Sequence, residues 1–71
     1  MIATEDSRAS FRQAKLLMQA GINSSLAGEE DDAIKYFGEA KRRFESLRDT
    51  VEAAIARGWL ISVKKQHHAL R

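Results

Sequence analysis

Few residues in this chain have the types and spacing that chemistry requires, and its two histidines are the first to consider. His67 and His68 are adjacent, so on a helix their side chains would point about 100° apart. They could not chelate one metal ion as a pair four residues apart does. The chain has no cysteine and suggests no serine–histidine–acid set, so the sequence predicts no catalytic residue, metal site or cofactor. We expect a protein that is not an enzyme.

The charged residues are unevenly distributed along the chain. Glu29, Glu30, Asp31 and Asp32 form an acidic cluster, whereas every charged residue after Glu52 is basic. The formal net charge is only +2. Acidic side chains in the first turn of a helix are stabilised by the helix dipole. We therefore interpret the acidic cluster as helix-end electrostatics and the basic run as a solvated face.

Nucleic-acid binding is an alternative function that the basic residues leave open. Phosphate groups bind clustered lysines and arginines, and the candidate contacts are Lys41, Arg42, Arg43, Lys64 and Lys65. A recognition helix would also need polar side chains that read bases. The segment that ends at Val63 is mostly apolar, which favours a protein partner.

Composition predicts a single all-α domain. The 71 residues include no proline and four glycines, with 44% hydrophobic and 31% charged residues, which suits helices better than turn-rich strands. A core of this size seldom supplies more than about 3–5 kcal/mol, and there are no disulfides to add to it. We therefore expect self-association, most simply a homodimer.

The N-terminus predicts no targeting segment. Residues 1–7 contain acids and lack the basic-then-apolar order of a signal peptide, and no apolar run approaches the roughly 20 residues that span a bilayer. We expect a soluble, cytoplasmic protein.

The periodicity of apolar residues predicts three helices. Residues 1–6 are expected to form a flexible leader, and residues 7–71 a single domain with helices near 8–26, 30–47 and 50–68. The stripe of the second helix is the clearest, with apolar residues alternately four and three apart at Ala33, Phe37, Ala40, Phe44 and Leu47. The first helix has a similar series at Phe11, Ala14, Met18, Ile22 and Leu26.

Capping residues define the expected helix ends. Ser7 or Ser10 can cap the first helix, and Gly28 is suited to the left-handed residue that ends it. Asp49 with Glu52 has the spacing of a capping-box variant, so a third helix should begin there. The short connection at Gly28 forces an antiparallel hairpin.

The segment after Gly58 can be interpreted in two ways. Residues 59–63 include an aromatic residue, Trp59, and the β-branched Ile61 and Val63, as in a strand. A lone strand would leave its backbone groups unpaired unless a second chain supplied an edge. We favour a helix that continues to about residue 68.

The order of residues from Leu17 to Phe44 resembles a tetratricopeptide repeat, a helical hairpin of about 34 residues. The matching positions are Gly21, Gly28, Ala33, Phe37 and Ala40. Leu17, Ser24 and Glu45 stand where the family commonly has tryptophan, tyrosine and proline. The resemblance implies a single repeat followed by a capping helix.

Two similar architectures remain open. One is a three-helix bundle like the microtubule-interacting-and-transport domain, which has a similar step from Gly28 to Ala33. The other is a dimerising hairpin in which two copies form a larger bundle.

The tetratricopeptide resemblance also implies where a partner would bind. In that family the first helix of each repeat lines a concave groove, and the matching positions here are Lys15, Met18, Ile22, Ser25, Glu52, Ala56 and Trp59. Such an apolar groove suits an amphipathic helix from another protein or a second copy. The alternative is that Met18, Ile22 and Trp59 simply fill the core.

Overall fold

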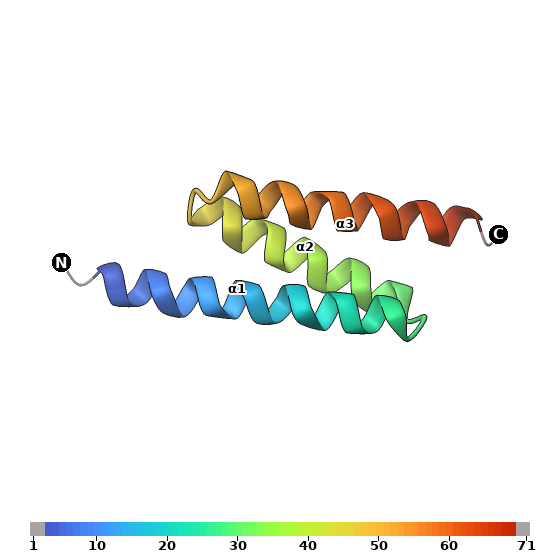
Figure 1. Cartoon of the computed structure of the whole chain (residues 1–71), viewed down its shortest axis with the longest axis horizontal. Coiled ribbons are helices and arrows are strands. Elements are labelled where there is room, and N and C mark those ends of the chain that lie inside the picture. Colours follow the sequence, from blue (N-terminus) through green and yellow to red (C-terminus); the bar gives the residue numbers. More distant parts are fainter. Residues whose placement is uncertain (1–2, 70–71) are drawn as a thin grey trace.

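Three α-helices make up the protein (Figure 1). The computed structural model describes the backbone of residues 3–69 and the side chains of residues 8–66. The helices are α1 (Ala3–Leu26), α2 (Glu30–Ser46) and α3 (Thr50–Ala69), and α2 packs against both of the others. Sequential helices run antiparallel (Figure 1), which confirms the prediction of an all-α helical hairpin with a third helix in a small three-helix bundle. Residues 59–63 are helical.

The start of α1 differs from the expectation of a leader and a helix near residue 8. The helix begins at Ala3, so both Ser7 and Ser10 lie inside it and neither caps its start. Residues 3–6 include alanine and glutamate, which are good helix formers, and this explains how the helix continues through them. Residues 1 and 2 of the expected leader lie outside the described part of the chain.

Both interhelical turns have the same backbone hydrogen bonds. After α1, the N–H of Gly28 donates to Ser25 O at 3.1 Å and the N–H of Glu29 donates to Ser24 O at 2.8 Å. After α2, the N–H of Arg48 donates to Glu45 O and that of Asp49 to Phe44 O, at 3.0 and 2.9 Å. This pair of bonds defines a Schellman ending. Each turn therefore connects its helices through only three residues.

The two turns differ in the residues that form them. The left-handed position is Gly28 (φ 80°) in the first turn and Arg48 (φ 60°) in the second, where a side chain makes this conformation unfavourable. Conversely, the carboxylate of Asp49 accepts a hydrogen bond from the N–H of Glu52 at 3.1 Å, whereas Glu29 makes no side-chain capping bond. The predicted glycine stop and aspartate cap are both confirmed.

The core is centred on α2. Ala33, Phe37, Ala40 and Phe44 are buried on one stripe of this helix, as its periodicity predicts. Phe44 contacts Phe11 of α1 edge-to-face, with ring centroids 5.8 Å apart. The other helices contribute Ala14, Met18, Ala53, Ala56 and Val63.

The ring of Phe37 on α2 contacts both of the other helices. Its ring stacks on Trp59 of α3 at a centroid distance of 5.4 Å and an interplanar angle of 14°. On the α1 side, a Cβ added to Gly21 would lie 2.7 Å from Cε1 of Phe37, which is closer than packed atoms allow. Gly21 therefore lets α1 approach the ring.

The molecule is elongated. In Figure 1, α1 extends past the α2–α3 turn at one end, and α3 extends past the α1–α2 turn at the other. The radius of gyration is 12.9 Å, against about 11 Å for a compact domain of this length. The ends of both helices therefore have fewer neighbours than the centre does.

Candidate functional site

The candidate site lies along the facing edges of α1 and α3. Nζ of Lys15 on α1 is 3.6 Å from Oε2 of Glu52 on α3. The same Nζ lies 5.8 Å from the centroid of the Phe11 ring. Because half of the Lys15 side chain is exposed, solvent screening limits what this pair adds to stability. Its role is to connect two helices that otherwise both pack on α2.

The other residues of the predicted groove fall into buried and accessible groups. Met18 and Ala56 are buried in the core. Ile22 is half-buried and packs against the core, and Ser25 is also half-buried. Trp59 keeps 38% of its surface exposed while one face covers Phe37. Only part of the groove that the resemblance implies is therefore accessible to a partner.

The basic residues do not form one patch. Lys41 pairs with Glu45 at 3.4 Å and Arg42 pairs with Glu39. Nη1 of Arg43 donates to Oε1 of Gln13 on α1 at 3.0 Å.

Successive residues point about 100° apart on a helix, so these three side chains leave α2 in different directions. Lys64 and Lys65 are exposed on α3. The candidate phosphate contacts are thus distributed over separate surfaces.

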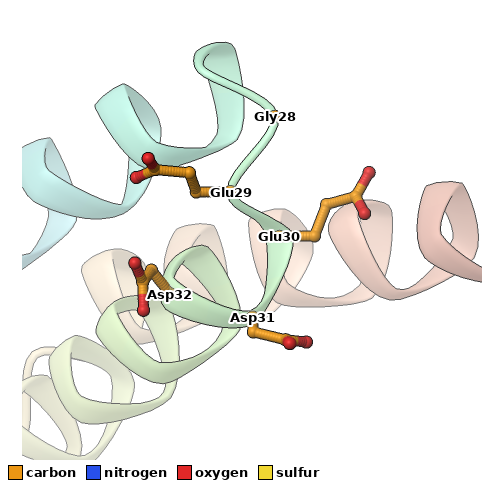
Figure 2. Close-up of a pocket in the computed structure, with 5 residues that line it drawn as sticks. All are labelled: Gly28, Glu29, Glu30, Asp31 and Asp32. Atoms are coloured by element: carbon orange, nitrogen blue, oxygen red, sulfur yellow. The ribbon is translucent and has the colours of Figure 1, made fainter.

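The acidic cluster surrounds the α1–α2 turn. Figure 2 shows the carboxylates of Glu29 and Asp32 on one side of the turn and those of Glu30 and Asp31 on the other. These four residues and Gly28 line an open depression. Glu30, Asp31 and Asp32 occupy the first turn of α2, where the helix dipole stabilises them. Among the described residues no group of three histidine, cysteine or acidic side chains is placed to hold a metal ion. The side chains of His67 and His68 lie outside the described set.

The exposed apolar surface of α3 extends beyond the segment 59–61 that the sequence predicts to be only partly covered. Val51, Ile55 and Ile61 are 68%, 44% and 50% exposed, although they belong to the same apolar run as the buried Ala53, Ala56 and Val63. The detectable signal is that residues 51–63 contain only two charged residues, Glu52 and Arg57. A surface helix normally has one polar side.

None of the helices in the described part of the chain is long and apolar enough to cross a membrane. Comparison with protein families, with characterised proteins and with solved structures finds no match to this chain. Function is therefore inferred from the chain's own residues.

Proposed function

We propose that this chain is a small, cytoplasmic, non-enzymatic protein–protein interaction module. It is built as a tetratricopeptide-like hairpin with a capping helix, associates with itself, and binds an amphipathic helix of a partner protein along the facing edges of α1 and α3. The close approach of Gly21 to Phe37 supports the tetratricopeptide resemblance, because small residues opposite large ones characterise that hairpin.

The main support for a binding role is the position of Trp59. This residue is anchored on one side by its stack with Phe37 and is open to solvent on the other. Tryptophan is enriched among the residues that dominate binding energy at protein interfaces. Phe11 also remains more than a third exposed, so an apolar helix could cover accessible surface on α1 as well as Trp59 on α3.

The basic residues give less support to the alternative of nucleic-acid binding. Two of the three candidate phosphate contacts on α2, Lys41 and Arg42, pair with glutamates of the same helix. Their directions diverge, so one phosphate backbone could not follow all of them.

The test uses a displayed library of random amphipathic helical peptides with the purified protein as bait. We expect enriched peptides with apolar residues at helical spacing, and loss of their binding in Trp59→Ala with helicity and cooperative melting retained. Leu26→Ala is the matched control, because Leu26 is 83% exposed at the end of α1 and should bind as the parent does.

Two results would contradict the proposal. One is a Trp59→Ala variant that binds the enriched peptides as well as the parent. The other is a variant that loses its helical fold, which would assign Trp59 to the core alone.

A further inference from the structure

The outer face of α3 is apolar and free of charge over three turns. This face consists of six exposed residues: Val51, Ala54, Ile55, Gly58, Ile61 and Ser62. Successive residues of a helix are about 100° apart, so these six lie within a sector of about 120° on the side away from the core.

The two charged residues between positions 51 and 63 lie at the edges of this face. Glu52 is directed to Lys15 of α1. Arg57 lines a depression on the α2 side together with Glu45 and Arg48. A helix that is apolar on opposite sides is normally buried on both, and here the described residues of the chain cover only one side.

On this face the residues within four positions of Gly58 are symmetric in size about it. Ile55 and Ile61 are each three positions from it, Ala54 and Ser62 are each four, and Val51 and Lys65 are each seven. Two such helices that cross antiparallel at Gly58 would set Ile55 of each against Ile61 of the other. The small residues between them would let the two helix axes approach closely. The face is thus complementary to itself, which an interface with twofold symmetry requires.

Packing within the chain does not explain Gly58. Gly21 makes room for the Phe37 ring and Gly28 adopts a positive φ, but a Cβ at Gly58 would meet nothing within 4 Å. Glycine within a helix is unfavourable compared with alanine. A close contact with another helix would give this position a structural role.

Charge selects the direction of the second helix. Lys65 continues the apolar face at its C-terminal end. In a parallel pair the two Lys65 ammonium groups would be side by side, which is unfavourable. In an antiparallel pair the two lysines are about 21 Å apart.

We infer that two copies of this chain form a twofold-symmetric dimer in which their α3 helices pack antiparallel, with Gly58 at the axis. This rests on the proposed self-association and adds the face and the direction of contact. The stem of Lys65 covers Val51 of the other copy while its ammonium group reaches solvent. The edge that carries Trp59 lies beside this interface and remains available for another partner.

Single cysteines test this arrangement without interference, because the chain has none of its own. Gly58→Cys should form a disulfide-linked dimer under mild oxidation. A mixture of Ile55→Cys and Ile61→Cys chains should link to each other. Val51→Cys should not link to itself, since antiparallel packing separates the two copies of this residue by about 21 Å, beyond the reach of a disulfide.

The collision control is Leu16→Cys, at an exposed position on α1. The mixed Ile55→Cys and Ile61→Cys chains should link at least about tenfold faster than this control, because the interface raises the local thiol concentration. Adding Gly58→Leu to both chains should remove that difference.

Linking of Val51→Cys as fast as the mixed pair would overturn the antiparallel direction. Rates equal to the Leu16→Cys control in every variant would overturn the α3 interface. If the parent still sedimented as a dimer in that case, self-association would stand and only its assigned face would be wrong.

Discussion

The helices α2 and α3 flank the same core but distribute their residues differently. On α2 the apolar stripe from Ala33 to Phe44 is buried, and most of the charged residues lie on the remaining surface. On α3 the buried residues Ala56 and Val63 are matched by exposed apolar residues on the opposite side. A helix like α2, with one apolar side and one polar side, can bury all of its apolar side within a single chain. A helix like α3 has a second apolar side, which the described part of the chain leaves exposed.

The largest expected difference between the two helices is in the free energy of unfolding. Phe37→Ala and Phe44→Ala should each lower it by roughly 3–5 kcal/mol, because both rings are fully buried. Val51→Ala on the outer face of α3 should change it by no more than about 0.5 kcal/mol in the monomer. Urea unfolding at one fixed low protein concentration would measure all three. A Phe44→Ala variant as stable as the parent would mean that the α2 stripe is not the core.

A second difference concerns glycines that face the interior and glycines that face solvent. Gly21→Ala should destabilise the fold by about 1–3 kcal/mol, because its Cβ would press on the Phe37 ring. Adding Phe37→Leu, a smaller side chain, should reduce the penalty of the alanine.

Gly38→Ala on α2 is the matched control for this pair. Nothing lies within 4 Å of an added Cβ there, so alanine should raise stability by about 0.5–1 kcal/mol. Thermal unfolding followed by circular dichroism would measure each effect. Equal changes for Gly21→Ala and Gly38→Ala would exclude a close approach of α1 to Phe37.

A third difference concerns the residues at the turns before α2 and α3. Arg48→Gly should stabilise the fold by about 1 kcal/mol, because glycine adopts the left-handed conformation without a steric penalty. Gly28→Ala should destabilise it by a similar amount. The urea midpoints of the two variants should therefore shift in opposite directions. A shift in the same direction would show that the two turns are not equivalent in solution.

Most of the fold could be predicted from the sequence because its local signals agree. Gly28, Asp49 and the stripe of α2 each predict the element that the structure contains, and each works through bonds within a few residues. The start of α1 was harder, since a serine with capping spacing resembles a cap even where helix formers precede it. Arg48 gives no sequence signal at all for its positive φ, because an arginine is not expected in that conformation.

The candidate site could be predicted only in part. The tetratricopeptide positions include residues that are on the α1–α3 edge, such as Lys15, Glu52 and Trp59. The resemblance could not tell which of them are buried, because burial depends on the angle at which α3 crosses α2. Periodicity alone does not predict burial at Leu26 either. This residue continues the apolar series of α1, but it lies past the end of the core and is exposed.

Sedimentation equilibrium tests most directly whether the outer side of α3 is an interface. We predict that the parent chain, on the order of tens of micromolar, sediments at twice its mass of 8.0 kDa. Gly58→Leu should sediment at 8.0 kDa with unchanged helicity, and Leu16→Asp should remain a dimer because Leu16 lies on α1. A parent mass of 8.0 kDa, or a Gly58→Leu variant that stays dimeric, would contradict the account.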